Sequence, residues 1–389
     1  MQTPPSARPH CPHFSSGPCA KRPGWTMGAL QNACIGRNHR SPRAQAKLAD
    51  AIARTKRLLG IPDGHRLAIV PGSNTGAFEL ALWSLLGERG VDVLAWESFG
   101  HGWASDVLDE LRLEDVRVFE APYGKLPDLT RVDTDRDVVL VWNGTTSGVR
   151  VPDASWIKDE HQGLVLCDAT SAVFAMDIPW NQLDAVTFSW QKALGGEGQH
   201  GVLVLSSRAI ERLETYRPSW PMPKVFRVTK RGSLEEALFR GSTINTPSML
   251  CVEDYLDALQ WADQAGGLPG LIERTQTNFA VLERWVAGTP WVAFLAEDPA
   301  TRSPTSVCLK VIDPWFEKLK PEAQRASIAE ICAYLEQEGV AYDIQSYREA
   351  PPGLRVWCGC TVEAEDLMAL TGWLDFAFQR VQSVKADKT

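Results

Sequence analysis

The feature that most constrains the fold is a regular alternation of short apolar runs with helical stretches, beginning near residue 65. Several runs are apolar without strict alternation, which is typical of strands covered on both faces. Strands that alternate with helices predict an α/β architecture, with a mostly parallel sheet sandwiched by helices. The predicted strands span residues 67–73, 91–98, 116–121, 137–144, 163–170, 185–191 and 201–207, and residues 74–88 are expected to form the helix after the first strand.

The pattern changes after about residue 250. Residues 251–267 and 268–288 are expected to form two amphipathic helices, and Gly266-Gly267 between them is a plausible domain boundary. The remainder combines strand-like 306–312 and 353–359 with helical 322–339 and a last helix, which predicts a smaller α+β domain. We therefore expect an N-terminal arm over 1–40, a large domain over 41–265 and a small C-terminal domain over 266–389.

Composition excludes several classes of protein. Forty Lys and Arg against 48 Asp and Glu give a net charge of −8, which offers no general basic field for nucleic acid. No apolar stretch approaches the roughly 18–20 residues needed to span a membrane, and the Pro-rich first 25 residues do not resemble a signal peptide.

The cysteines indicate a reducing compartment, so we expect a cytoplasmic location. All nine are scattered, and no CxxC pair occurs. Cys11, His13 and Cys19 are close enough in sequence to suggest a metal loop, but no fourth ligand is evident, and we expect no metal site.

Polar and Gly-rich clusters follow four of the predicted strands, at residues 72–76, 143–148, 168–171 and 191–192. Open α/β sheets bind their ligands at the carboxyl ends of the strands. The sequence therefore predicts that these clusters converge on one site.

Two ionisable residues in these clusters suggest cofactor chemistry. Lys192 follows a predicted strand beside Gly-rich chain, and a lysine held in a cleft suits Schiff-base chemistry, although an isolated lysine there is more often on the surface. Asp168 ends an apolar run, and it is either a helix cap or a carboxylate paired with the ring nitrogen of pyridoxal phosphate. The residues alone leave both alternatives open.

The other candidates concern anions and rings. Residues 72–76 lie between a strand and a helix, where backbone N–H groups bind phosphate or merely cap a turn. Trp103 either belongs to the core or stacks on a flat heterocycle. Arg355 and the pair His39-Arg40 present cations that are either solvated or clamp substrate anions. The string G-x-G-x-x-G at 196–201 precedes a strand instead of following one, which disfavours NAD binding.

Several motifs together resemble the phosphoserine aminotransferases, class V members of the fold-type I enzymes that use pyridoxal phosphate. They are FSSGP (14–18), NHRS (38–41), SWQK (189–192), INTPS (244–248) and GLRVWCG (353–359), and the resemblance runs from about residue 10 to 380. It implies a homodimer with shared active sites that exchanges L-glutamate and 3-phosphohydroxypyruvate with 2-oxoglutarate and O-phospho-L-serine. Another class V activity, serine– or alanine–glyoxylate transamination, is the nearest alternative, and phosphohydroxythreonine is a possible further substrate.

The resemblance also implies roles for individual residues. Lys192 would form the Schiff base with the cofactor and then move the substrate proton, and Asp168 would pair with the ring nitrogen. Trp103 would stack on the ring and Thr145 would bind its hydroxyl. The residues expected to hold the cofactor phosphate are Asn74, Thr75 and Gln191, joined by Asn245 and Thr246 of a second subunit.

Substrate binding is assigned in the same way. Arg355 would bind the α-carboxylate, and Ser16 and Arg40 would contact the amino or keto acid. His39 and Arg348 would face the distal phosphate or carboxylate. Thr75 departs from the enteric branch of the family, which has an arginine there that holds the substrate phosphate, so Arg348 or Lys230 is expected to supply that charge.

Overall fold

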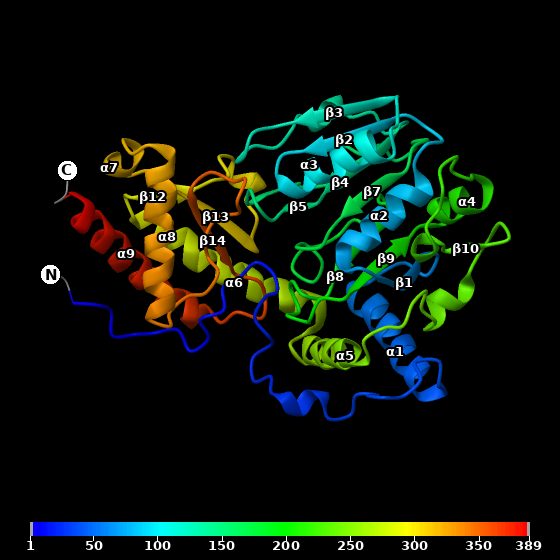
Figure 1. The fold of residues 1–389 in the computed structure, drawn as a ribbon, viewed down its shortest axis with the longest axis horizontal. Helices are drawn as coiled ribbons and strands as arrows, with labels where there is room; N and C mark the ends of the chain where they lie inside the picture. Colours follow the sequence, from blue (N-terminus) through cyan, green and yellow to red (C-terminus); the bar gives the residue numbers. More distant parts are fainter. Residues whose placement is uncertain (1–2, 387–389) are drawn as a thin grey trace.

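The computed structural model describes residues 3–386 and contains a seven-stranded sheet in the order β1-β9-β8-β7-β4-β2-β3 (Figure 1). β9 is antiparallel to both neighbours, whereas β2–β3, β2–β4, β4–β7 and β7–β8 are parallel pairs. The prediction of a mostly parallel α/β sheet is therefore confirmed. Its strands are β1 (Arg66–Pro71), β2 (Val91–Ala95), β3 (Val116–Glu120), β4 (Asp137–Val141), β7 (Val165–Asp168), β8 (Ala185–Ser189) and β9 (His200–Leu205).

Apolar runs form strands here because helices and loops exclude water from both faces of the sheet. Every residue of β2, β4, β8 and β9 is buried. Helix α2 (Ser73–Leu85) packs on β8 and β9, α3 (Ser98–Ser105) packs on β2, and α4 (Ser207–Thr215) follows β9. Contiguous apolar strands are expected from burial of this kind.

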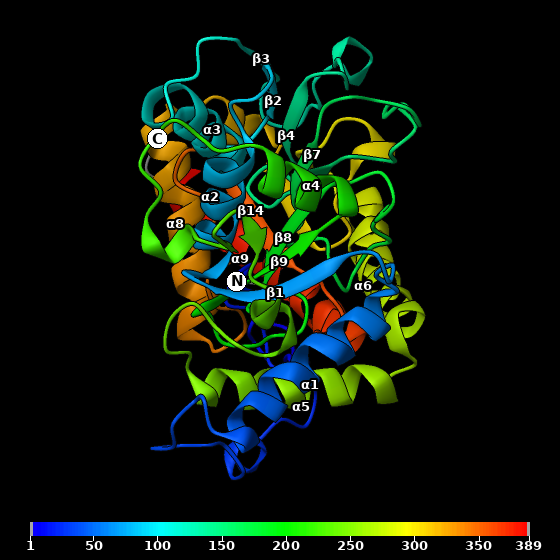
Figure 2. The same cartoon turned by 90° about the vertical axis from the view of Figure 1, so that its right-hand side faces the viewer.

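Two long helices, α1 (Pro42–Leu59) and α5 (Met249–Gln264), pack on each other beside β1 (Figures 1 and 2). The alternation of apolar runs did not single out α1. Its ends nevertheless carry ordinary signals, because the Ser41 hydroxyl accepts a hydrogen bond from Ala44 N and Gly60 ends the helix at a φ of 62°.

The C-terminal part is built on an antiparallel sheet of β12 (Val292–Phe294), β13 (Ser306–Val311) and β14 (Gly353–Trp357). Helices α6 (Gly267–Gly288) and α8 (Pro321–Gln337) pack against α9 (Ala364–Ala386), and α7 (Pro314–Glu317) is a single turn. The domain boundary expected after residue 265 falls at the turn between α5 and α6, where Gly266 has a φ of 96°.

Short elements complete the described chain. They are the hairpins β5 (Asn143–Gly144) with β6 (Val149–Arg150) and β10 (Thr229–Lys230) with β11 (Ser233–Leu234), the 3-10 turns η1 (Met27–Leu30), η3 (Leu129–Arg131), η4 (Lys224–Phe226), η5 (Glu236–Arg240) and η6 (Pro299–Thr301), and the π-turn η2 (Asp106–Glu110).

The N-terminal segment connects the two sheets. Tyr342 N donates to Pro12 O and Trp357 N donates to Phe14 O, so residues 12–14 are bound to the C-terminal part. Cys19 N then donates to Gln191 O, 2.8 Å away, just beyond β8. Residues 15–18 therefore cross from one sheet to the other.

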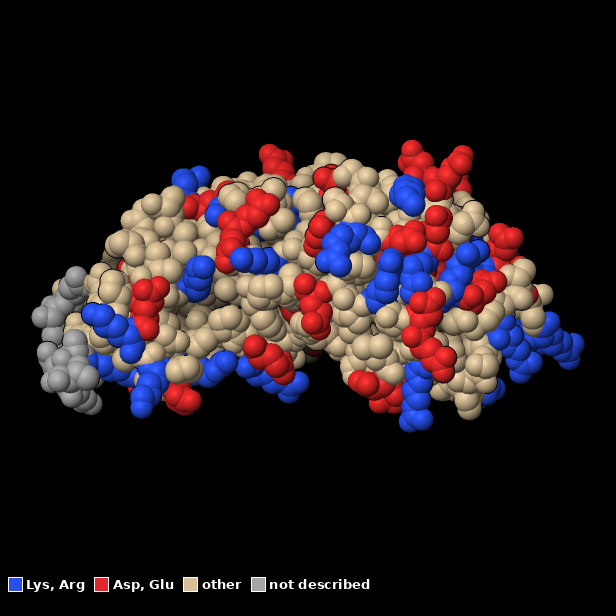
Figure 3. All heavy atoms as spheres, turned by 90° about the horizontal axis from the view of Figure 1, so that it is seen from above, with Lys and Arg blue, Asp and Glu red and all other residues tan. Residues whose placement is uncertain are grey.

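Charged side chains of both signs are exposed on the surface. Acidic and basic side chains are interspersed over the face in Figure 3. Within residues 3–386, no helix combines the length and apolarity that a membrane span needs.

The free energy of unfolding should fall below pH 6.5 because of His200. This side chain is 2% exposed, its Nε2 accepts a hydrogen bond from Ser248 N at 3.2 Å, and burial lowers its pKa from 6.5 to about 4. Between pH 6.5 and about 4, His200 is therefore protonated in the unfolded chain but neutral in the folded chain. We expect the contribution of neutral His200, on the order of 3 kcal/mol, to be present above pH 6.5 and lost as the pH falls to 4.

Urea unfolding at several pH values checks this expectation. His200→Gln keeps an acceptor for Ser248 N but does not titrate, so its free energy of unfolding should fall less steeply between pH 6.5 and 4. Equal slopes for the two proteins would show that His200 is not held neutral.

Candidate active site

The carboxyl ends of β1, β2, β4, β7 and β8 lie at one edge of the large sheet, because these strands share one direction. The four polar clusters follow β1, β4, β7 and β8. Side-chain hydrogen bonds link the clusters after β4 and β7, as from Asn143 Nδ2 to Ser171 Oγ at 2.8 Å, and Trp103 Nε1 of α3 donates to Asp168 Oδ2 at 3.2 Å. The sheet thus brings Trp103 and Asp168, which are 65 residues apart in sequence, into contact.

Lys192 follows β8, and its amine lies against the N-terminal segment. Nζ donates a hydrogen bond to the carbonyl oxygen of Ser16. Gly17 is so close that a Cβ there would collide with Nζ, and its φ of 145° is one that other residues avoid. Burial lowers the pKa of Lys192, and the charge of Arg355 lowers it further, whereas the Cys19 thiol and the charges of Asp168 and Glu97 oppose this shift. A larger share of the amine is therefore neutral than for an exposed lysine.

Asp168 ends β7, and its two carboxylate oxygens have different partners. Oδ1 accepts hydrogen bonds from Thr170 N at 3.0 Å and Thr170 Oγ1 at 2.7 Å, which is a capping arrangement. Oδ2 instead accepts from the indole of Trp103. Burial raises the pKa of Asp168, while Thr170, Trp103 and the positive charge of Lys192 oppose the rise. A cationic ring nitrogen would be a favourable partner for such a carboxylate.

Trp103 lies on α3 and is 6% exposed. Its ring packs against Phe78, with centroids 4.8 Å apart at 58°. The indole therefore belongs to the core and is also bound to Asp168, so the two alternatives for this residue are compatible.

The candidate phosphate ligands fit an anion with acceptor oxygens. Asn74 is buried at the start of α2, and Thr75 beside it is exposed. The amides of Asn74 and Gln191 each have a buried oxygen with no hydrogen-bond partner among residues 3–386. Because an amide can turn over, each could present its NH₂ to a phosphate. Together with the buried amine of Lys192 and the carboxylate of Asp168, these groups fit pyridoxal phosphate.

Thr145 is buried behind this edge and already has partners. Its hydroxyl donates to Ser171 Oγ at 2.8 Å, and its carbonyl accepts from Ser306 Oγ at 2.7 Å. Ser306 Oγ also lies 3.0 Å from Ser16 Oγ, and since its proton goes to Thr145 O, the Ser16 hydroxyl donates here. Hydroxyl contacts therefore connect Thr145 with the segment that contacts Lys192.

Arg355 lies on β14 opposite Cys308 of β13. Its Nε is buried without a partner within residues 3–386, and its guanidinium lies 5.5 Å from the ring of Tyr347. An unpaired guanidinium whose charge reaches Lys192 suits a substrate carboxylate. Arg348, in contrast, is 81% exposed and paired with Glu349, and Lys230 is exposed on β10.

Four expected residues do not meet this site within the chain. Arg40 is exposed just before α1, and His39 has a lowered pKa because of partial burial and the charge of Arg40. Asn245 and Thr246 lie between η5 and α5. Gly241, four residues before Asn245, packs on Gln45 of α1, so both segments lie near the first turns of α1. No hydrogen bond joins them to Lys192 or Asp168 among the described residues.

Sequence reasoning missed Glu97, which is fully buried between β2 and α3. Its carboxylate binds Gly100 N and Thr146, close to the site. The available signal was its place at the end of a predicted strand, directly before a helix, where acidic residues commonly cap. No cluster of three or more His, Cys, Asp or Glu within residues 3–386 is suited to a metal ion.

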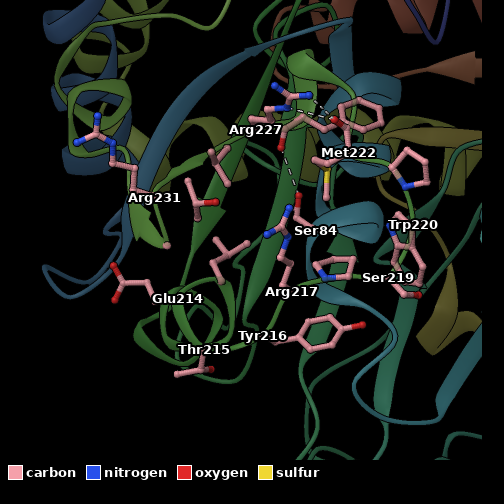
Figure 4. Close-up of a pocket in the computed structure, with 17 residues that line it drawn as sticks. Ser84, Glu214, Thr215, Tyr216, Arg217, Ser219, Trp220, Met222, Arg227 and Arg231 are labelled. Atoms are coloured by element: carbon pink, nitrogen blue, oxygen red, sulfur yellow. Dashed lines mark hydrogen bonds between the residues drawn. The ribbon is translucent and has the colours of Figure 1, made fainter.

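A cleft of about 730 Å³ lies apart from these residues, between α2, the end of α4 and residues 216–232. Figure 4 shows Arg217, Trp220 and Met222 around it, with Arg227 bonded to the Met222 carbonyl. None of the expected site residues lines this cleft. The size of a cleft therefore does not locate the candidate active site.

Comparison with known proteins agrees with the geometry. The model of the family described as "Aminotransferase class-V" matches residues 33–329. The chain is 58% identical over 378 residues to the phosphoserine aminotransferase of Methanosarcina barkeri, covering 97% of this chain and 100% of the relative. The identity to the phosphoserine aminotransferase of Methanosarcina mazei is also 58%, with the same coverage.

Solved structures show the same fold at lower identity. A phosphoserine aminotransferase from Cytophaga hutchinsonii matches with a TM-score of 0.79 and 22% identity, covering 93% of this chain and 98% of that one. A phosphoserine aminotransferase from Trichomonas vaginalis with bound pyridoxal phosphate gives 0.73 and 17%, covering 94% and 100%. An alanine–glyoxylate aminotransferase from Nostoc gives 0.76 and 20%, covering 98% and 97%, so the fold alone does not select the substrate.

Removing the indole donor from Asp168 should destabilise the protein. Trp103→Phe leaves Oδ2 of a buried carboxylate without its hydrogen bond, which costs about 1–3 kcal/mol beyond the loss of ring volume. Trp357→Phe is the matched control, because Trp357 is 0% exposed and its Nε1 has no partner within residues 3–386. Urea unfolding of both variants measures the difference, and equal losses of unfolding free energy would contradict the expectation.

Proposed function

The chain belongs to the class V aminotransferases, and from this membership we propose that it is a phosphoserine aminotransferase dependent on pyridoxal phosphate. It transfers the amino group between L-glutamate and 3-phosphohydroxypyruvate, giving O-phospho-L-serine and 2-oxoglutarate. The observation that carries this assignment is the 58% identity with a phosphoserine aminotransferase along 97% of the chain. The alternative, glyoxylate transamination, has the support of likenesses of fold at 16% and 20% identity, far below 58%.

The residues at the strand ends form the cofactor site in this proposal. When bound, pyridoxal phosphate supplies an electron sink that stabilises negative charge developing at the substrate Cα. Lys192 provides the amine that anchors the cofactor, Asp168 the carboxylate that faces its ring nitrogen, and Trp103 the flat surface beside it. Thr145 would turn its hydroxyl from Ser171 toward the ring. The phosphate ligands are Asn74, Thr75 and Gln191.

Lys192 also moves the proton at the substrate Cα. A base must be neutral to accept a proton, and burial together with the charge of Arg355 lowers the pKa of this amine. The Ser16 carbonyl holds Nζ by a hydrogen bond to a neutral group. The amine is thus oriented without the strong stabilisation of its charged form that an ion pair would give.

Cations outside the cofactor site bind the substrate anions. Arg355, whose guanidinium has no carboxylate partner among residues 3–386, offers it to the α-carboxylate, and Ser16 contacts Lys192 through its carbonyl. Arg348 serves the distal phosphate after leaving Glu349, with which it forms a 2.5 Å ion pair. Arg348 would supply the positive charge of the arginine that the enteric branch has at the position of Thr75. His39 and Arg40 complete this pocket.

We place His39, Arg40, Asn245 and Thr246 in the active site of a second copy of the chain. Both segments lie near the start of α1, no hydrogen bond within residues 3–386 joins them to Lys192, and Arg40 and Thr246 are exposed. A homodimer with shared sites accounts for polar segments that the chain's own site does not use. The proposed division into residues 1–40, 41–265 and 266–389 places the site between the large and small domains, beside the arm. The nine cysteines are free, which suits the cytoplasm.

The substrate assignment predicts a strong preference for a phosphorylated amino acid. O-phospho-L-serine should convert the bound cofactor to its amine form with a kcat/KM at least about a hundredfold above that of L-serine. The reason is that its phosphate binds the cationic side chains proposed for the distal pocket, whereas the hydroxyl of L-serine carries no charge. A spectroscopic half-reaction titration measures both. Lys192→Ala should abolish turnover, whereas Lys125→Ala, at an exposed lysine paired with Glu297, should not. Equal rates for the two amino acids would reject the substrate.

Subunit mixing tests the shared site. Lys192→Ala and the double variant Asn245→Ala, Thr246→Ala should each be nearly inactive alone, because every site in either homodimer lacks one part. After mixing and subunit exchange, each mixed dimer holds one complete site, and activity should recover to about a quarter of wild type. Full activity of the double variant alone, or no recovery on mixing, would contradict the proposal.

A further inference from the structure

Glu97 is a buried acid that the proposed mechanism does not use. It lies between β2 and α3, has 0% exposure and extended backbone angles, and its Oε1 accepts a hydrogen bond from Gly100 N at 2.8 Å. This bond caps α3, the helix that carries Trp103. A cap alone does not need full burial, since capping residues lie at helix ends that water usually reaches.

The second carboxylate oxygen binds another segment. Oε2 accepts from Thr146 Oγ1 at 2.7 Å and from Thr146 N at 3.2 Å. Thr146 Oγ1 in turn accepts from Ser98 N at 3.1 Å. All three groups around Glu97 are donors, which is the environment of an ionised carboxylate and leaves no acceptor for a carboxylic acid proton. Gly144 permits the contact, because a Cβ there would stand 2.9 Å from Glu97 Cγ.

Two chains of contacts lead from Glu97 into the site. Through α3 it fixes Trp103, whose indole donates to Asp168. Through Thr146 it fixes the adjoining Thr145, whose carbonyl accepts from Ser306 Oγ. That hydroxyl contacts Ser16 Oγ, and the Ser16 carbonyl accepts from Lys192. The partners of Asp168 and of Lys192 are thus both joined to one carboxylate.

We propose that Glu97 is a positioning residue for the cofactor site. Its carboxylate binds both α3 and the turn after β4, and so fixes the distance between these two segments. Trp103 and Thr145 then face the same ring. The carboxylate also adds a negative charge near Lys192. The inference rests on the proposed function, because the ring is that of pyridoxal phosphate. Glu97 itself touches neither cofactor nor substrate in this proposal.

Its charge acts on Lys192 together with three other groups. The amine faces Cys19, Arg355, Asp168 and Glu97, of which the carboxylates raise its pKa and Arg355 lowers it. Asp168 also raises the pKa of Glu97, although burial is the larger cause and Thr146 and Gly100 oppose it. Removing the charge of Glu97 should therefore lower the pKa of Lys192.

Three variants separate geometry from charge. Glu97→Gln removes the charge and turns an NH₂ toward either Gly100 N or the two donors of Thr146, whereas Thr146→Val keeps the charge and removes the hydroxyl bond. Thr146→Ser restores the hydroxyl and serves as the conservative rescue. Glu79→Gln is the matched control, because Glu79 is a half-buried carboxyl of α2 whose pKa is also raised by burial.

Two measurements are made on each protein. The first is the dissociation constant of pyridoxal phosphate, which should rise about tenfold in Glu97→Gln and Thr146→Val and return toward wild type in Thr146→Ser. The second is the pH dependence of Lys192 acylation in the cofactor-free protein, followed by mass spectrometry. Its midpoint should move to lower pH in Glu97→Gln only.

If Glu97→Gln matches Glu79→Gln in both measurements, Glu97 is only a helix cap and the proposal is wrong. If the dissociation constant of pyridoxal phosphate rises as much in Thr146→Ser as in Thr146→Val, the hydroxyl bond is not the positioning contact. Should the wild-type protein fail to bind pyridoxal phosphate, the proposed function fails instead. The Lys192 titration would then still decide whether Glu97 acts on this amine.

Discussion

The site depends on the shared direction of five strands, β1, β2, β4, β7 and β8, whose carboxyl ends meet at one edge. β9 interrupts this pattern between β1 and β8. The interruption does not separate their ends, because Gly201 of β9 lacks a side chain where Ser73 and Ala77 of α2 pack against it. The start of α2 therefore remains beside the segment that follows β8, and a phosphate-binding turn and an amine belong to one site.

The edge of the sheet becomes an enclosed site only when the N-terminal segment crosses it. That segment is held by backbone hydrogen bonds at both ends, from Trp357 N to Phe14 O on one side and from Cys19 N to Gln191 O on the other. Ser16 and Gly17 between them contact the amine of Lys192. The environment of Lys192 thus depends on how the two sheets are placed, and on contacts more than 170 residues apart in sequence.

These long-range contacts explain how far sequence reasoning reached. Apolar runs predicted the strands, and strand direction then predicted where polar clusters meet, so Asp168 and Lys192 were found from local patterns. Glu97 was not, because an acid after a strand has the same local signature whether it is a solvated cap or is buried by the turn at Thr146. Periodicity also gives no signal of whether Arg40, which we propose binds substrate, would act in its own chain or in a second copy. Helix α1 was not predicted, although its buried Leu48, Ile52 and Leu59 recur at helical spacing.

The pKa of Lys192 depends on which groups bind the carboxylates of Asp168 and Glu97. Asp168 and Glu97 are both buried, yet N–H and hydroxyl groups satisfy them, and no ion pair joins either one to Lys192 within residues 3–386. A direct ion pair would stabilise the ammonium form and raise the pKa of the amine. Here the hydrogen bond of Lys192 goes to a neutral carbonyl, so burial prevails and its pKa falls. The donors that bind both carboxylates thus take the place of an ion pair with the amine, which is left free to act as a base.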